Sequence, residues 1–205
     1  MLLRKRPFPI IKIGEYVYKF LPPDLLEIET DFFELNDRIS IYNEDTPFAK
    51  FVIPQIDKFK FFTKTPFLGE TLFESKNNIE LLFKSISYFS QIFKQEDRTT
   101  VCIGDIQLRN VYFSNGDFYL LDLGISANKK VPIFYNESRF LVHLVDSGFS
   151  NKVSSILKSS INKEEILKSM NRRYIKVIKK RLFAKKFFSC FYRAFSYLKF
   201  LLQLC

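Results

Sequence analysis

The sequence predicts an α+β fold in which a reduced N-terminal β-lobe precedes a helical C-terminal lobe. Three observations lead to this class. Runs of β-branched and aromatic residues cluster in 9–63, apolar stripes with helical spacing dominate from residue 78 onward, and a strand pair at 101–124 interrupts those stripes. With 205 residues, 47% of them apolar, the chain has room for one compact unit or two small lobes.

The chain begins with strands and one helix. Residues 9–21 alternate partly between apolar and polar side chains and predict one or two strands, which Pro22 and Pro23 end. Asp24 is a suitable N-cap for a helix over 25–41, along which apolar residues recur every three or four positions.

Two further strands and a connector complete the first lobe. Residues 50–54 and 58–63 are rich in phenylalanine and β-branched residues and predict strands. Pro66 and Gly69 break the pattern over 65–72, so we expect an extended connector there and not a strand interior.

The strongest helical pattern leads into the strand pair. Over 78–94 the apolar positions fall on one helical face: Ile79, Leu82, Phe83, Ile86, Phe89 and Phe93. Residues 101–124 then predict two short strands joined by a hairpin, because Asn115-Gly116 is a frequent two-residue hairpin turn.

The remainder predicts helices over about 136–147 and from about residues 151 and 163 onward. We therefore expect three parts. These are a small N-terminal lobe over 1–66, a C-terminal catalytic lobe over 67–162, and a basic, aromatic helical segment over 163–205.

Cysteine and histidine usage excludes several classes of site. Cys102, Cys190 and Cys205 are far apart in sequence and lack CxxC spacing, which predicts neither a disulfide scaffold nor a zinc site and favours a reducing compartment. The single histidine, His143, lies in an apolar run and predicts a core or surface histidine. The N-terminal residues lack the long uninterrupted apolar region of a signal peptide.

The positive charge is concentrated at the C-terminal end. From Lys163 onward there are 12 Lys/Arg and two Asp/Glu, so the whole net charge of +10 lies in this segment. Basic residues beside aromatic ones over 172–205 favour contact with an anionic membrane surface. Two alternatives stay open: a terminal helix packed on the helical lobe with a solvated basic face, and an RNA-binding arm.

Three polar residues around the predicted hairpin suit phosphoryl transfer. Asp105 lies before the first strand, and Asn110 follows Asp105 by five residues. Asp122 follows the second strand. Transfer of a phosphoryl group requires positioning, metal ions on the phosphates, and a carboxylate that orients the attacking hydroxyl and accepts its proton. Asp105 would be that base, while Asn110 and Asp122 would hold Mg²⁺, which prefers oxygen ligands.

Gly104-Asp105-Ile106-Gln107-Leu108-Arg109-Asn110, followed by Asp122-Leu123-Gly124, resembles the catalytic and metal-binding motifs of the protein-kinase-like superfamily. The segment is most similar to the small-molecule and atypical branch, in which the motif reads HGDxxxxN. The segment Phe67-Leu68-Gly69-Glu70-Thr71-Leu72 resembles the hinge of the same branch.

Two families of this branch fit the short length and the basic end of the chain. It is most similar to the lipopolysaccharide core heptose kinases, which have a comparable catalytic loop and a Lys/Arg-rich helical end. The small atypical kinases of a tRNA-modification pathway are the second family.

The resemblance also implies residues that bind ATP. Lys19 would be the phosphate-binding lysine, and Glu34 would pair with it, with Glu27 and Asp31 as rivals on the same helix. Pro66 and Phe67 would accept adenine through backbone hydrogen bonds.

Departures from the motifs refine the expectation. Ile103 replaces the histidine that braces the loop, and Gly14 is the only glycine before Lys19, so a glycine-rich loop is absent or much reduced. Gly104 replaces an arginine that binds activation-loop phosphate in regulated protein kinases. No Ala-Pro-Glu motif follows Gly124, which favours a small or lipid-linked hydroxyl acceptor over a protein.

The resemblance therefore implies an ATP- and Mg²⁺-dependent kinase with an alcohol group as acceptor. Its acceptor would be a sugar hydroxyl of a glycolipid, the heptose of the lipopolysaccharide core, at the inner face of the cytoplasmic membrane. The alternatives are a catalytically weak pseudokinase or binding module of the same fold, and a kinase acting in a tRNA-modification pathway.

Overall fold

The structure is a computed structural model that describes residues 2–4, 9–20, 33–121, 123, 129–183 and 187–204. The chain forms two compact units, each assembled from two stretches of sequence. The first unit comprises Met1–Ile79 and Val101–Lys129, and the second comprises Glu80–Thr100 and Lys130–Cys205. The division into three parts at residues 66 and 162 stays a prediction.

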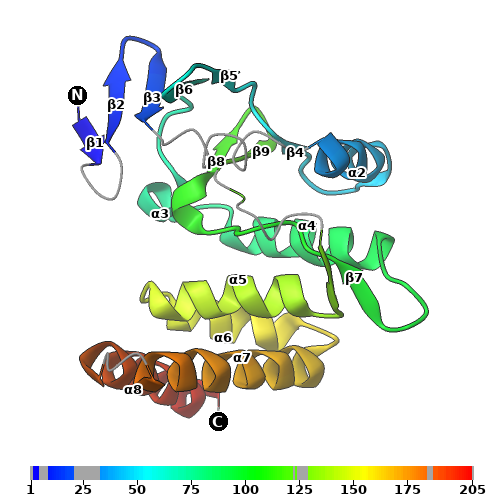
Figure 1. Ribbon diagram of the computed structural model, residues 1–205. Coiled ribbons are helices and arrows are strands. Elements are labelled where there is room, and N and C mark those ends of the chain that lie inside the picture. Colours follow the sequence, from blue (N-terminus) through cyan, green and yellow to red (C-terminus); the bar gives the residue numbers. More distant parts are fainter. Residues whose placement is uncertain are drawn as a thin grey trace. The chain divides into compact units, whose positions relative to one another are not determined.

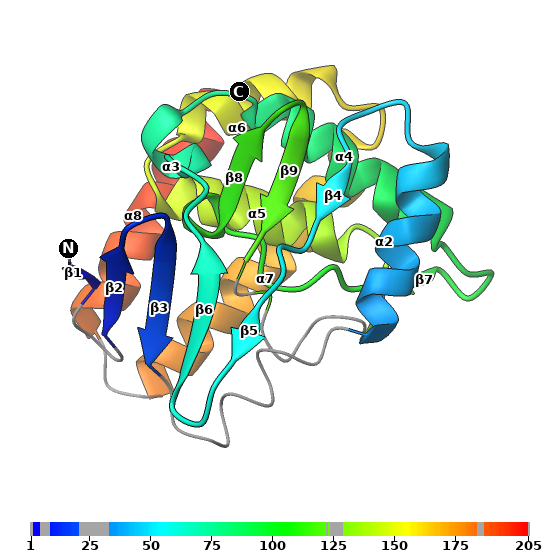
Figure 2. The ribbon, with the colours of Figure 1, turned by 90° about the horizontal axis from the view of Figure 1, so that it is seen from above.

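An antiparallel sheet of five strands forms one part of the first unit, in the order β1-β2-β3-β6-β5 (Figure 2). Its strands are β1 (Leu2–Arg4), β2 (Ile10–Ile13), β3 (Tyr16–Phe20), β5 (Asp57–Lys58) and β6 (Phe62–Pro66). The strands predicted over 9–21 are confirmed as the pair β2 and β3. Gly14, at φ +57°, supplies the left-handed backbone of the tight turn between them.

The single strand predicted over 58–63 is wrong, because the chain reverses direction within that segment. The Phe59 N–H donates to the Phe62 carbonyl at 2.9 Å, and the two rings stack with centroids 4.5 Å apart. The segment is therefore a hairpin between β5 and β6. Aromatic stacking across the turn holds it without glycine, proline or asparagine at the turn positions.

A three-stranded sheet, in the order β4-β9-β8, forms the other part of the first unit. Its strands are β4 (Phe51–Val52), β8 (Val111–Ser114) and β9 (Asp117–Leu120). The predicted hairpin is confirmed: Ser114 pairs with Asp117, and Asn115 and Gly116 have φ of 53° and 88°, the positive values that a type I′ turn requires.

Helix α2 (Phe33–Asp45) is fixed to β4 at its C-terminal end. Asn43 pairs with the backbone of Phe51 as another strand would, accepting from its N–H at 2.9 Å and donating to its carbonyl at 2.7 Å. The rings of Tyr42 and Phe51 stack 4.7 Å apart. Of the helix predicted over 25–41, residues 25–32 lie outside the described residues.

The second unit is built from helices (Figure 1). They are α4 (Ile79–Ile92), α5 (Tyr135–Asp146), α6 (Ser150–Ser159), α7 (Lys163–Phe183) and α8 (Phe187–Leu204), with a short strand pair of β7 (Thr99–Val101) and β10 (Lys130–Pro132) at its margin. Helix α5 contacts α6, α7 and α8. The helices predicted over 78–94 and 136–147 are confirmed, as is the α+β class with a small sheet-bearing part and a helical part. Across the described residues, no helix combines the length and apolar character needed to cross a membrane.

An ion pair fastens α8 to the rest of the helical unit. Arg193 Nη1 lies 2.9 Å from Asp146 Oδ2 of α5, with side-chain exposures of 22% and 11%. The Tyr174 hydroxyl of α7 donates to Asp146 Oδ1 at 3.1 Å, and its ring stacks on Tyr197 of α8 with centroids 3.8 Å apart. Burial, and then the neighbouring Asp146 carboxylate, raise the pKa of Tyr174 above its ordinary value.

A buried carboxyl lies at the start of α5. Glu137 is 3% exposed, and burial raises its pKa to about 7, against the opposing effect of hydrogen bonds from its own backbone N–H and from Ser90. The Ser90 hydroxyl accepts from Asn136 Nδ2 at 3.0 Å. The helical core therefore contains a carboxyl group that favours its protonated form.

Candidate active site

The first predicted motif is packed directly against the second. The Asp105 N–H donates to the Leu123 carbonyl at 2.7 Å. Gly104 has φ +102°, and a Cβ atom there would lie 2.7 Å from the Leu123 carbonyl oxygen and 2.8 Å from its Cβ. Glycine is therefore required at position 104 by both the backbone conformation and the close approach.

Asn110 is bonded to Leu121, the residue that precedes Asp122 in the sequence. A 3₁₀ turn over Leu108–Asn110 ends at Asn110, and its carbonyl accepts from the Leu121 N–H at 2.8 Å. Asp105 and Asn110 are thus each hydrogen-bonded through the backbone to a residue adjoining Asp122. Asp122 itself lies outside the described residues.

Apolar side chains anchor the loop that carries these residues. Ile103, Ile106 and Leu108 are buried, whereas Asp105 and Asn110 remain partly exposed. The chain alternates between buried apolar residues and polar residues, so the apolar side chains anchor the loop in the core. Ile103, at the position where the resembling branch has histidine, is one of the anchors.

Gln107 is a site residue that the sequence did not single out. Its Nε2 donates to Asp105 Oδ2 at 2.8 Å, and its backbone is extended. The bond orients the carboxylate of Asp105. The signal for it was the amide side chain two residues after the aspartate, a separation that brings side chains onto the same side of an extended segment.

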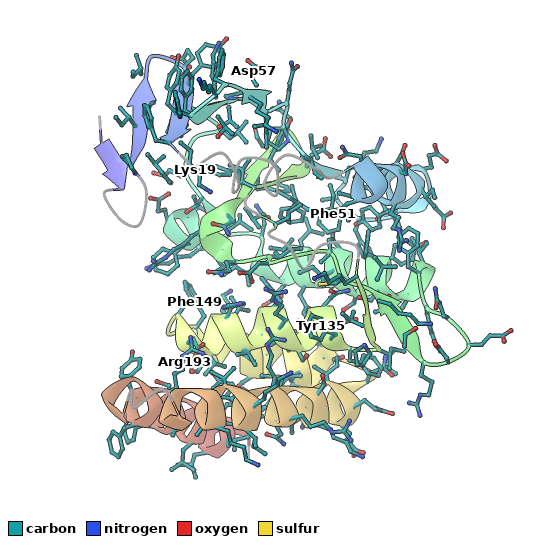
Figure 3. All side chains as sticks on the ribbon, viewed as in Figure 1. Lys19, Phe51, Asp57, Tyr135, Phe149 and Arg193 are labelled. Atoms are coloured by element: carbon teal, nitrogen blue, oxygen red, sulfur yellow. The ribbon has the colours of Figure 1, made fainter. Side chains whose placement is uncertain are left out.

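Lys19 lies on β3, a central strand of the five-stranded sheet (Figure 3). It pairs with Ile10 of β2 and with Thr63 of β6. Because directly opposed residues in a sheet point to the same face, Lys12, which pairs with Val17, shares a face with Lys19. Lys58 of β5 shares that face too, because it pairs with Thr63, so the described sheet offers two further lysines there that were not predicted.

The predicted adenine-binding segment follows β6. Pro66 pairs with Tyr16, and the Phe67 N–H donates to the Glu15 carbonyl at 2.8 Å. Lys12 Nζ lies 3.4 Å from the centroid of the Phe67 ring, a cation–π contact. Since the Phe67 N–H is engaged within the sheet and proline has no N–H, the next backbone donor along the segment is that of Leu68.

The connector joins the sheet to the loop of Asp105 and Asn110. Thr71 forms an isolated β-bridge with Tyr112 of β8, and Thr71 and Glu74 form a capping box for the short helix α3 (Leu72–Ser75). The guanidinium of Arg109, beside Asn110, lies 4.5 Å from the Phe73 ring centroid. These contacts link the segment after Pro66 to residues on both sides of Asn110 in the sequence.

Glu34 lies in the first turn of α2, and its side chain is outside the described residues, as are Glu27 and Asp31. The structure therefore brings Asp105 and Asn110 together around Leu121 and Leu123. Its described contacts place Lys19, Pro66 and Phe67 within one sheet, and they leave the pairing of Lys19 with Glu34 as a prediction.

No protein-family model and no curated protein sequence matches the chain. The solved structures that are similar in fold alone include the following three. A choline/ethanolamine kinase family protein from Mesorhizobium loti has 7% identity and a TM-score of 0.45, over 83% of this chain and 68% of that one. Aminoglycoside phosphotransferase APH(3'')-Id from Streptomyces rimosus has 9% identity and a TM-score of 0.47, over 83% and 90%. Choline kinase LicA from Streptococcus pneumoniae has 12% identity and a TM-score of 0.48, over 81% and 78%.

Proposed function

We propose that this chain is an ATP- and Mg²⁺-dependent kinase that transfers a phosphoryl group to a sugar hydroxyl of a glycolipid, the heptose of a lipopolysaccharide core. The observation that carries the proposal is the pair of backbone bonds that join Asp105 to Leu123 and Asn110 to Leu121. They hold the backbones of Asp105 and Asn110 beside the two sequence neighbours of Asp122, which supports a shared site for the three residues that phosphoryl transfer would use.

Each residue has a distinct role in this proposal. Asp105 orients the acceptor hydroxyl and accepts its proton, and Gln107 holds the Asp105 carboxylate in place. Asn110 and Asp122 would hold Mg²⁺, and their amide and carboxylate oxygens are the hard ligands that this ion prefers. The bound ion would neutralise charge on the phosphates.

The nucleotide would be held by the five-stranded sheet. Lys19 steadies the phosphates and pairs with Glu34, while the segment at Pro66 and Phe67 receives adenine. With the Phe67 N–H donated to Glu15, the Phe67 carbonyl and the Leu68 N–H are the backbone groups that would meet the base.

The choice of acceptor rests on two sequence features. No Ala-Pro-Glu motif follows Gly124, which removes the peptide-binding segment of protein kinases. The basic and aromatic residues of 172–205 suit an anionic surface, so we place the reaction at the inner face of the cytoplasmic membrane.

Substitution of single aspartates tests the catalytic assignment. We expect Asp105→Asn and Asp122→Asn each to lower the rate of phosphate transfer from ATP to purified core glycolipid by roughly 10²–10⁴-fold, the usual contribution of a general base or metal ligand. Asp117→Asn, in the hairpin turn, is the matched control and should keep full activity. Full activity in both site variants would contradict the proposal.

Gln107→Met tests the positioning role separately. Loss of its hydrogen bond to Asp105 should lower kcat by about 10–100-fold, because small displacements of a catalytic group are costly, while the KM for ATP stays constant. An unchanged kcat would limit Gln107 to a structural role.

A non-catalytic nucleotide-binding module is the second candidate. The turn at Gly14-Glu15 between β2 and β3 is too short to form a glycine-rich loop, and Ile103 fills the position of the bracing histidine. A thermal-shift titration with ATP and Mg²⁺, run beside the turnover assay, separates the candidates. Binding without turnover supports the module, and a missing phosphate in the lipopolysaccharide of a deletion strain supports the kinase. Capture of tRNA by 172–205 with no glycolipid activity would support the kinase of tRNA modification.

A further inference from the structure

One face of α8 presents apolar side chains to solvent. The exposed residues, which we call the α8 stripe, recur at helical spacing with exposures of 76%, 61%, 55% and 71%: Phe191, Phe195, Leu198 and Leu202. The opposite face carries Tyr197, Phe200 and Arg193, which pack on or bond to the other helices. The stripe is therefore separate from the face by which α8 packs on the other helices.

A cavity of about 470 Å³ opens beside the stripe. Phe195 and Lys199 line it from α8, and Phe149 and Lys152 line it from the corner where α5 gives way to α6 (Phe149 is labelled in Figure 3). Among the described residues that line the cavity, none is acidic. It therefore combines aromatic walls with two ammonium groups, and Phe195 belongs to both the cavity and the stripe.

Helix α7, which contacts α8, carries positive charge. Arg172, Lys176 and Lys179 of α7 are exposed, and no acidic residue follows Glu165 in the sequence. An apolar stripe on a helical unit with exposed cations favours binding in the plane of an anionic membrane surface. The acid-free sequence after Glu165 contains 11 Lys/Arg, and this charge also favours that surface over an average protein partner.

We propose that the α8 stripe and the cavity at Lys152 and Lys199 form one docking surface for an anionic lipid membrane. The stripe enters the boundary between acyl chains and headgroups, and the two lysines bind a lipid phosphate in the cavity. This deepens the proposed function, because a glycolipid acceptor is met at such a surface. The proposal specifies which residues of 172–205 contact the membrane, and it adds Lys152 of α6 to that contact surface.

Sedimentation of the full chain with lipid vesicles tests the proposal. The chain should bind vesicles of phosphatidylglycerol and phosphatidylcholine and leave vesicles of phosphatidylcholine alone unbound. Each cation near an anionic surface contributes about 1 kcal/mol, so Lys152→Ala combined with Lys199→Ala should weaken binding about 30-fold. Phe195→Ser combined with Leu198→Ser should weaken it at least as much, because both apolar side chains leave the lipid.

Matched controls lie elsewhere on the same helical unit. Lys158→Ala removes an exposed lysine of α6 outside the cavity, and Ile161→Ser removes a fully exposed apolar side chain outside the stripe. Both should bind as the parent does, and circular dichroism confirms that all variants are folded.

Three results would overturn the proposal. The first is an absence of binding to anionic vesicles. The second is binding that the lysine variant weakens but the stripe variant leaves unchanged, which would reduce the interaction to charge alone. The third is a concentration-dependent dimer that the stripe variant abolishes, which would assign the stripe to a second copy of this chain. Since the vesicle assay requires no catalysis, its failure and that of the kinase assignment are separate events.

Discussion

Glu137→Gln should make the stability of this protein less dependent on pH. The carboxyl of Glu137 is buried at the start of α5, and its pKa is raised from 4.5 to about 7, chiefly by burial. Below pH 4.5 the group is neutral in both the folded and the unfolded chain and costs nothing. As the pH rises toward 7, the unfolded chain loses this proton first, so the free energy of unfolding falls with pH and levels off above the folded pKa.

The size of the effect follows from the two pKa values. A shift from 4.5 to about 7 corresponds to about 3 kcal/mol at 1.36 kcal/mol per unit. Glutamine has the same shape and no charge, so its free energy of unfolding lacks this contribution at every pH. Any cost of burying the amide is the same at each pH and cancels when the variant is compared with the parent across the range.

Urea denaturation of both proteins from pH 4.5 to pH 8 measures the effect. The difference in unfolding free energy, variant minus parent, should grow by about 3 kcal/mol over this range, or roughly 6–12 °C in Tm for a chain of this size. Glu164→Gln, at an exposed position of α7, is the control and should show no such growth. A difference that stays constant with pH would refute the reasoning, because the carboxyl would then be ionised or neutral equally in both states.

Two further substitutions test the packing described above. Gly104→Ala should abolish phosphate transfer and lower stability by about 2–4 kcal/mol, since it adds the Cβ clash with Leu123 to the strain of a positive φ. Gly148→Ala carries a similar φ of +88° with nothing within 4 Å, so it should cost only about 1–2 kcal/mol and keep activity; equal effects of the two would contradict the close approach. Arg193→Met leaves the Asp146 carboxylate without its guanidinium and should cost about 3 kcal/mol, measured by urea denaturation, and a loss under 1 kcal/mol would show that the ion pair is solvated.

Sequence patterns predicted the helices and turns that are determined by residues close together in the sequence. The helix over 78–94 follows from one apolar stripe, and the hairpin at Asn115-Gly116 follows from the turn residues. The β5–β6 hairpin was missed because a contact between Phe59 and Phe62 replaces the usual turn residues. Helix α3 was missed although its capping box, Thr71 with Glu74, is visible in the sequence.

The parts of the candidate site that depend on spacing along the sequence could be predicted. The parts that depend on how strands pair could not. The step from Asp105 to Asn110 is carried by one loop, so the sequence contains it directly. The shared face of Lys12 and Lys19 depends on the pairing of β2 with β3, and a shift of one residue would move Lys12 to the other face. The requirement for glycine at 104 likewise depends on Leu123, which approaches from a later part of the chain.

The hydrogen bonds that join the two motifs are made by backbone groups and not by the side chains assigned to catalysis. The bonds between the motifs use the backbone of Asp105, Asn110, Leu121 and Leu123, and any side chain would permit them. The apolar anchors of the loop are Ile103, Ile106 and Leu108, which are buried, whereas Asp105 and Asn110 are partly exposed. Only Gly104 is irreplaceable for packing. Oxygen groups at these positions suit both the proposed kinase and a module that binds ATP and Mg²⁺ without turnover, so the turnover assay, and not the packing, distinguishes the two.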